Sequence, residues 1–257
     1  DKRKYDEFVG FSRIGEGALG GKGRGLAFID SFLKRNKLFN KYENVNISIP
    51  RTVVISTEVF DQFIETHRLI KFAAESNNDD DILNEFISKE LPQWALQDIE
   101  AFLKTTKSPI AIRSSSMLED SNYQPFAGIF ATFMVANTEI NKMIEMVSNA
   151  VKSVIASAFF ESSKAYLKAT SHTIEEDKMA VILQEVIGKQ YQDVYYPNIS
   201  GVARSINFYP IGDEKPNEGI ANIALGLGEI IVGGGQTLRF SPFHPKKVLQ
   251  LSSPAST

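Results

Sequence analysis

Cysteine is absent from this 257-residue chain and histidine occurs three times, so two broad classes of site are excluded or poorly supported. Without thiols the chain forms neither a disulfide framework nor a thiolate metal centre. The histidines, His67, His172 and His244, have no second ligand at the spacing of a metal motif, and no Ser-His-Asp arrangement can be argued. A thiolate metal site is therefore excluded, and catalysis by a Ser-His-Asp triad has no support in the sequence.

The chain also lacks long apolar runs and a strong charge of one sign. No uninterrupted run approaches the ~20 residues that span a bilayer, and the N-terminal DKRKYDEF is polar rather than a signal peptide. A net charge of −3 does not favour a partner bound through nucleic-acid phosphates. We expect a cytoplasmic globular protein that binds neither membranes nor nucleic acid, with a length that suits one large domain or two lobes.

Glycine, in contrast, is concentrated in one stretch, Gly15–Gly25, which reads GEGALGGKGRG. Glycine tolerates positive φ and lets backbone N–H groups approach a ligand closely. Such a run before a helix N-terminus suits a phosphate, and Lys22 adds a positive charge. The stretch predicts a phosphate-binding loop, with a merely flexible loop as the alternative.

The loop fits none of the common phosphate motifs completely. A Walker A loop requires glycine where Glu16 stands and Ser or Thr where Gly23 stands. A GxGxxG pattern begins at Gly15, but the preceding Val9–Ile14 is a poor strand for a dinucleotide fold. The His-Arg-Asp and Asp-Phe-Gly strings of protein kinases are missing, which makes a kinase a distant alternative.

Hydrophobic periodicity predicts helices and strands mixed along the chain, followed by a strand-rich region. Helices are expected at 24–37, 56–69, 82–89, 92–104 and 138–169, and strands at 49–55, 109–113, 130–135, 179–187, 191–196, 201–209 and 220–225. This order predicts an α+β fold with two lobes, residues 1–177 and a β-rich lobe at 178–257 that is expected to be truncated at its C-terminus.

Arg113 ends a short predicted strand and opens the sequence RSSSMLED. Its planar guanidinium can bind a phosphate through two hydrogen bonds, and the three following serines can add donors. The alternative is an arginine that pairs with Glu119 or Asp120 to hold a turn. The residues alone leave both interpretations open.

Three further segments give weaker signals. Phe126–Gly128 precedes a strand that contains Thr132, and its glycine allows backbone to approach a phosphate. Gln184–Ile187 ends an apolar strand whose backbone groups can read an adenine edge, although an ordinary strand end is the simpler interpretation. Gly226–Gly235 is a second glycine cluster, in which Glu229 is either a Mg²⁺ ligand or part of a hairpin connection.

Taken together, these segments resemble the N-terminal ATP-binding domain of phosphoenolpyruvate synthase and pyruvate phosphate dikinase, a domain that rifampin phosphotransferase shares. The resemblance covers roughly Phe11 to Gly235 and rests on segments in the family order: GGKGRGLAFI, IPRTVVIST, IAIRSSSMLEDSNYQPFAGIFATF, MAVILQEVI, SGVARSINFYP and ALGLGEIIVGG. The stretch Arg113–Phe133 is the most specific, because it combines Arg-Ser-Ser, Glu-Asp and Phe-Ala-Gly.

The resemblance implies an ATP-grasp-like fold that holds ATP and Mg²⁺ between two lobes, with metal ligands that the sequence does not identify. Lys22 and Arg113 would act on the phosphates as catalytic residues. The cofactor-binding set that the resemblance implies is Lys22, Arg113, Gly128, Thr132, Gln184, Glu185 and Ile187. ATP would phosphorylate a histidine on a separate swivelling domain, which would serve pyruvate or another acceptor on a further domain. The chain alone would be an inactive part of this phosphotransferase.

Some positions depart from the family pattern. None of the three histidines has the Gly-rich, Thr/Ser-containing context of the phosphohistidine, and the family's metal-binding Glu and Gln-x-Arg-Pro strand would fall beyond Thr257. Arg204 stands where the family is usually apolar, and Ile129-Phe130 replace the common glutamines. These departures motivate an alternative: a degenerate, non-catalytic nucleotide-sensing or interaction module of a larger protein.

Overall fold

The computed structural model describes residues 10–116, 130–170 and 178–248. The chain forms two compact units, Asp1–Val186 and Ile187–Thr257. The units therefore divide at Val186 and not at the expected residue 178. The physical reason is that the strand Met179–Glu185 hydrogen-bonds on both sides within the first unit, as shown next.

The first unit contains a five-stranded sheet in the order β1-β2-β5-β3-β4. The pair β1–β2 is parallel, whereas β2–β5, β5–β3 and β3–β4 are antiparallel. The strands are β1 (Phe11–Ile14), β2 (Thr52–Ile55), β3 (Ile110–Ser116), β4 (Thr132–Val135) and β5 (Met179–Glu185).

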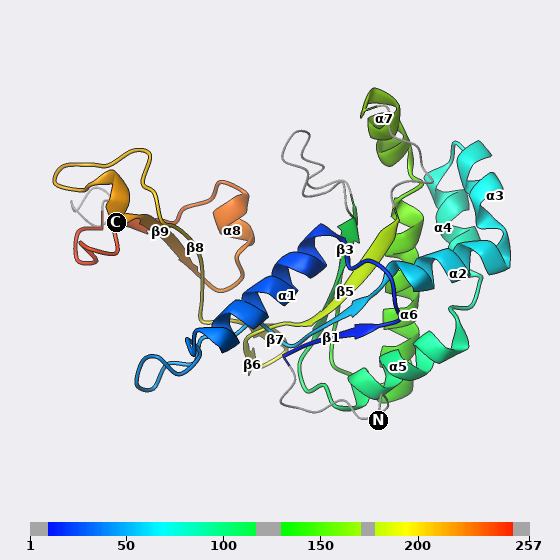
Figure 1. Ribbon diagram of the computed structural model, residues 1–257, viewed down its shortest axis with the longest axis horizontal. Helices are drawn as coiled ribbons and strands as arrows, with labels where there is room; N and C mark the ends of the chain where they lie inside the picture. The colour runs from blue at the N-terminus through cyan, green and yellow to red at the C-terminus, as the bar shows by residue number, and fades with distance from the viewer. Residues whose placement is uncertain (1–9, 117–129, 171–177, 249–257) are drawn as a thin grey trace. The chain divides into compact units, whose positions relative to one another are not determined.

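Helices cover both faces of this sheet. Figure 1 shows α1 on one face and α2, α5 and α6 on the other. The helices of the first unit are α1 (Gly20–Arg35), α2 (Thr57–His67), α3 (Leu69–Glu75), α4 (Asp79–Ile87), α5 (Gln93–Lys104), α6 (Ile140–Ser157) and α7 (Glu161–Thr170).

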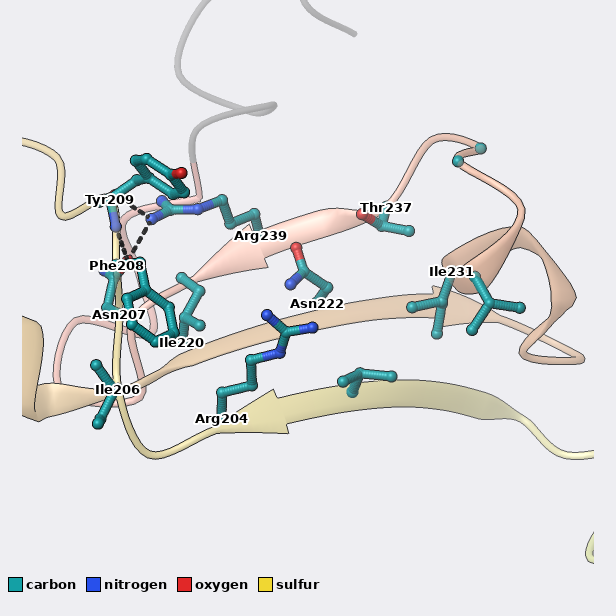
Figure 2. A pocket seen from close by; sticks show the side chains of 14 residues that line it. Arg204, Ile206, Asn207, Phe208, Tyr209, Ile220, Asn222, Ile231, Thr237 and Arg239 are labelled. Carbon is teal, nitrogen blue, oxygen red and sulfur yellow. Dashed lines mark hydrogen bonds between the residues drawn. The ribbon is translucent and has the colours of Figure 1, made fainter. Parts of the chain in front are cut away.

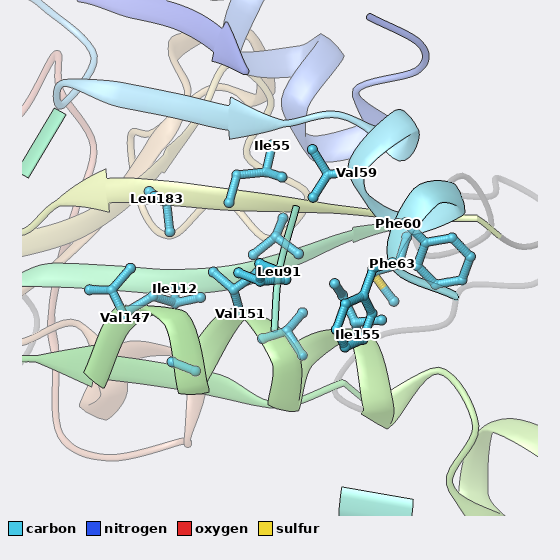
Figure 3. Close-up of a cluster of buried hydrophobic side chains, with 14 of the residues drawn as sticks. Ile55, Val59, Phe60, Phe63, Leu91, Ile112, Val147, Val151, Ile155 and Leu183 are labelled. Carbon is cyan, nitrogen blue, oxygen red and sulfur yellow. The ribbon is translucent and has the colours of Figure 1, made fainter. Parts of the chain in front are cut away.

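The main core lies between the sheet and α6 (Figure 3). Because successive strand residues point to opposite faces, Ile112 of β3 and Leu183 of β5 face the core together. Val147 and Val151 of α6 pack against them, and all four are completely buried. Burial of apolar surface, at about 25 cal/mol per Å², is what holds α6 on the sheet.

The stretch Ile140–Lys168 has the length and hydropathy of a membrane span, which the sequence analysis did not recognise. Of its most apolar window, 67% is buried inside the protein. Its first helix, α6, contacts β3, β4 and β5. The apolar character of α6 is thus used in the core of the first unit.

Three expectations about strands differ from the structure, and one of them is a length: the strand expected at 201–209 ends at Arg204. Residues 11–14 form β1 although Arg13 interrupts their apolar pattern, because Arg13 is exposed and, within the described part of the chain, β1 pairs with β2 alone. Residues 191–196 form a hairpin instead of one strand, since Gln192 adopts a left-handed φ of 53° between two short strands.

The second unit consists mainly of short antiparallel strands. Its three-stranded sheet has the order β10-β9-β8, and β6 and β7 form the separate hairpin. The elements are β6 (Lys189–Tyr191), β7 (Val194–Tyr196), β8 (Ile199–Arg204), a 3₁₀ turn η1 (Pro216–Glu218), β9 (Ile220–Leu225), α8 (Glu229–Val232) and β10 (Leu238–Phe240).

Candidate functional site

One face of the first sheet, which we call the α1 face, presents several of the predicted site residues. Arg113 of β3 lies opposite Thr132 of β4 and Ile182 of β5 in the strand register. Gln184 lies one row along, opposite Ala111. Since residues two apart on a strand, and residues directly opposite across strands, share a face, Arg113, Thr132 and Gln184 all belong to the α1 face.

Lys22 lies on the same face because it belongs to α1, which packs against β3 and β5. It is the third residue of α1, and its Nζ lies 3.5 Å from the backbone oxygen of Ser114, next to Arg113 on β3. Arg113 is half-buried and Thr132 is exposed. Lys22 of α1 therefore reaches β3 at the residue that follows Arg113.

The glycine loop before α1 adopts one specific conformation. Gly15, Gly17 and Gly20, the three glycines of the GxGxxG pattern, have φ values of +80°, +88° and +69°. A Cβ on Gly17 would lie 2.8 Å from the Oγ1 of Thr57, and one on Gly15 would lie 2.7 Å from the Oγ of Ser56. These glycines allow the loop to pack closely on the start of α2.

Side chains of α2 already bind part of the loop backbone. The N–H of Glu16 donates to the Glu58 carboxylate, and the N–H of Ala18 donates to the Thr57 hydroxyl over 3.0 Å. A phosphate would therefore have to use the first turn of α1, where N–H groups have no partner within the helix. That turn begins at Gly20 and includes Lys22.

Thr57 and Glu58, which hold the loop, were not predicted as site residues from the sequence. They follow β2 directly, and the parallel strands β1 and β2 end at the same edge of the sheet. These contacts were not foreseen because residues 11–14 were not predicted to form a strand. When β1 pairs in parallel with β2, the loop after β1 lies next to the residues after β2. The side-chain oxygens at 57 and 58 then become its natural acceptors.

The predicted adenine segment divides between two faces. Gln184 donates from its Nε2 to the Thr52 hydroxyl at 2.9 Å on the α1 face. Glu185 belongs to the opposite face and pairs with Arg51, whose Nη1 lies 3.3 Å from its Oε1. The N–H of Glu185 also donates to the Arg51 carbonyl at 2.9 Å, and the N–H of Val186 to the Pro109 carbonyl at 2.8 Å.

Arg51 is a further residue that sequence reasoning missed. Its guanidinium lies 5.1 Å from the centre of the Phe102 ring and donates to both the carbonyl and the hydroxyl of Thr105. Together with Glu185 these contacts fix the end of β5. The remaining predicted residues lie elsewhere: Ile187 is exposed and begins the second unit, and Gly128 falls outside the described residues.

The second unit has an open pocket of about 670 Å³ on one face of its sheet (Figure 2). Arg204 and Asn222 point into it from β8 and β9, and Arg239 of β10 extends to Tyr209 at one end of the pocket. The lining residues are Val202, Arg204, Ile206, Asn207, Phe208, Tyr209, Ile220, Asn222, Ile231, Val232, Gly234, Gly235, Thr237 and Arg239.

Arg239 organises the loop at one end of this pocket. It donates to the Tyr209 carbonyl at 2.8 Å, to Asn207 at 3.2 Å and to Glu214 at 3.3 Å. Burial tends to raise the pKa of Glu214, but hydrogen bonds from the Ile211 N–H, Arg239 and Asn207 outweigh burial and hold the pKa below its usual range. Arg239 thus has an internal carboxylate partner, whereas Arg204 is exposed.

A magnesium site is not formed within the described ranges 10–116, 130–170 and 178–248. No group of three or more His, Cys, Asp or Glu side chains converges there. Glu229, the suggested ligand, is an exposed residue at the start of the four-residue helix α8. The described residues therefore do not fit a magnesium site by themselves.

Comparison with known proteins agrees with this architecture. Residues 16–245 match the family described as pyruvate phosphate dikinase, AMP/ATP-binding domain. The chain is also 27% identical over 191 residues to an uncharacterized phosphotransferase, YvkC, of Bacillus subtilis (strain 168). That alignment covers 74% of this chain but 21% of the relative, so the chain spans about a fifth of the relative's length.

The family match includes the glycine loop, β3, β5 and the sheet of the second unit. The mixed helices and sheets described above are those of an ATP-grasp-like nucleotide-binding fold. The chain therefore belongs to the pyruvate phosphate dikinase AMP/ATP-binding domain family.

Proposed function

We propose that this domain binds MgATP and positions it for transfer of a phosphoryl group to a histidine on a separate swivelling domain, within a phosphoenolpyruvate synthase-like phosphotransferase. The first turn of α1, Lys22 and Arg113 would hold the phosphates. The loop with Gly128, together with Thr132, would cover them, and Gln184, the backbone of Glu185 and Ile187 would contribute to adenine binding.

The observation that supports this proposal best is the shared α1 face. Lys22, Arg113, Thr132 and Gln184 come from four elements that are distant in sequence, yet all belong to one side of one sheet. A structural role for Arg113 alone would not require the accompanying cation at the N-terminus of α1. A helix N-terminus with two cations is a suitable environment for a polyphosphate.

Phosphoryl transfer mainly requires that the protein position the reactants and neutralise the phosphate charge. The protein forms few covalent bonds in this reaction, so oriented cations and backbone amides supply most of the catalysis. Lys22 contributes a point charge, and Arg113 a planar group able to donate two parallel hydrogen bonds. Magnesium would add charge neutralisation when bound, but the described residues give it no ligand set.

The test is a calorimetric titration of the 257-residue chain with ATP, AMP and GTP in the presence of Mg²⁺. The proposal expects ATP to bind more tightly than AMP, because the cations act on the β- and γ-phosphates. It also expects ATP to bind more tightly than GTP, through the adenine segment. Equal binding of ATP and AMP would argue against the phosphate assignment, and equal binding of ATP and GTP against the adenine assignment.

A second candidate, a non-catalytic nucleotide-sensing module, is favoured by Arg204. This arginine lies in the open pocket of the second unit, at a position that is usually apolar in the family. The full-length protein distinguishes the two candidates. An acid-labile phosphohistidine formed from ATP would support the phosphotransferase, whereas tight ATP binding without any phosphorylated histidine would support the sensor.

A further inference from the structure

Ser115 connects the two elements that hold the predicted phosphate-binding cations. It lies on β3 two residues after Arg113, on the α1 face, and is completely buried. Its hydroxyl donates to the Leu19 carbonyl at 2.7 Å and accepts from the Gly23 N–H at 2.9 Å. One side chain thus ties the first turn of α1 to the strand, on either side of Lys22 in the sequence.

The backbones of Gly20 in α1 and Ser115 in β3 are also in close contact. A Cβ on Gly20 would lie only 1.7 Å from the carbonyl oxygen of Ser115, so the helix start rests directly on β3. Gly20 and Gly23 are the buried residues of α1, and the remaining helix positions are half-buried or exposed. The partly buried Leu19 and Leu26 pack against apolar residues of the sheet, and beside them the Ser115 hydroxyl supplies directional contacts to the α1 N-terminus.

The two neighbouring serines are placed differently. Ser114 and Ser116 are also buried, but strand alternation turns them to the opposite, core-facing side of the sheet. Of the three serines in Arg-Ser-Ser-Ser, only Ser115 faces α1. Its O–H is already donated to Leu19, so it is not available as a phosphate donor in this arrangement.

We propose that Ser115 is a positioning residue, which aligns the α1 N-terminus and Lys22 with Arg113 so that both cations act on the same polyphosphate. This inference rests on the proposed function, in which those cations bind ATP. Ser115 itself would not touch the nucleotide. Its removal would leave the fold and the adenosine contacts in place while the phosphate-binding groups lose their alignment.

The experiment compares ATP and adenosine binding by the 257-residue chain and its variants. Ser115→Ala is expected to weaken ATP binding about tenfold, the loss that follows when one charge-assisted hydrogen bond is misaligned. Adenosine binding should be unchanged. Ser116→Ala is the matched control, with the same change on the same strand but on the other face, and should keep the ATP affinity of the unmodified chain.

A double-mutant cycle separates positioning from general loosening of the fold. If Ser115 acts through Lys22, Ser115→Ala should cost little further ATP affinity in a Lys22→Ala background. Additive losses, an equal loss of adenosine binding, or unchanged ATP binding by Ser115→Ala would overturn the inference. Failure of the unmodified chain to prefer ATP over adenosine would instead overturn the proposed function, and this inference with it.

Ser115→Cys provides a second test if the alanine variant does not fold. Cysteine keeps a similar volume but replaces the hydroxyl with a weaker donor and acceptor. A folded cysteine variant is expected to bind ATP more weakly than the unmodified chain, with adenosine affinity retained. Retention of full ATP affinity would show that the hydroxyl contacts do not matter.

Discussion

Glycines within one helix have opposite roles in this domain. Gly20 sits at φ +69° against the Ser115 backbone, and Gly23 has the Leu19 Cβ 3.1 Å from where its own Cβ would be. Gly25, two residues further, has nothing within 4 Å. Close packing against neighbouring atoms therefore requires glycine at positions 20 and 23 of α1, whereas at position 25 it leaves room for a side chain.

Alanine at these positions should separate the roles. Gly20→Ala is expected to lower the free energy of unfolding by more than ~2 kcal/mol, through left-handed strain and a collision with backbone. Gly25→Ala should raise it by about 0.5–1 kcal/mol, because alanine is the better helix former. Urea unfolding of both variants measures this. Equal effects would mean that α1 does not rest on β3 at Gly20.

Lys22 and Arg113 can be tested in the same way by binding. Truncation of either to alanine should weaken ATP binding roughly tenfold or more, since a hydrogen bond to a charged group contributes about 1.5–3 kcal/mol. Lys34→Ala is the control, because Lys34 is an exposed lysine near the other end of α1, paired with Asp30. Calorimetry that finds the same ATP affinity in all three variants would remove both residues from the site.

At the scale of elements, the long segments were predictable and the short ones were not. The apolar periodicity of 138–169 identified the region of α6 and α7, and the apolar run at 179–187 identified β5, because α6 and β5 are buried along much of their length. β1 was missed because an edge strand tolerates the exposed Arg13. The hairpin β6–β7 was missed because its turn uses Gln192, which the usual turn signals do not include.

Some contacts of the candidate site follow from strand alternation, whereas others depend on long-range packing and were not predictable. The position of Arg113 and Thr132 on one face follows from strand alternation once β3 and β4 are paired. The division of Gln184 and Glu185 between two faces follows from the same rule, but the sequence analysis treated them as one adenine-binding segment. The contacts of Ser115, Thr57 and Glu58 depend on long-range packing, which no local pattern reveals.

The loop before η1 depends on the ionised form of Glu214. Its folded pKa lies below the ordinary value of 4.5, so this carboxylate stabilises the loop above about pH 4.5. That stabilisation should be lost as the pH falls through the folded pKa. The NMR signal of the Ile211 amide, which donates to Glu214, should titrate below pH 4.5. In Glu214→Gln this titration should be absent, and its persistence would assign it to another group.

On the scale of the whole molecule, the two units are built very differently. The main core cluster belongs to the first unit. Among the described residues of the second unit, the buried apolar side chains are Ile220 and Ala221. The second unit depends instead on strand hydrogen bonds and on polar contacts such as those of Arg239.

Hydrogen exchange should detect this difference. Amides of β3 and β5 are expected to exchange only through global unfolding of the first unit, whereas amides of β8 and β9 should exchange through smaller openings. Mass spectrometry of peptides from the 257-residue chain measures both in one experiment. Equal protection of β5 and β9 would mean that the second unit is stabilised by more than its own described contacts.

The alternation of β3 also restricts how the length of this chain can change. Insertion or deletion of one residue between Ile110 and Arg113 that shifts the rest of the strand would turn both Arg113 and Ser115 into the core. Either change would separate the guanidinium from the lysine above it. Related chains should therefore keep the number of residues in this strand constant and place their length differences in exposed connections, such as the one between α1 and β2.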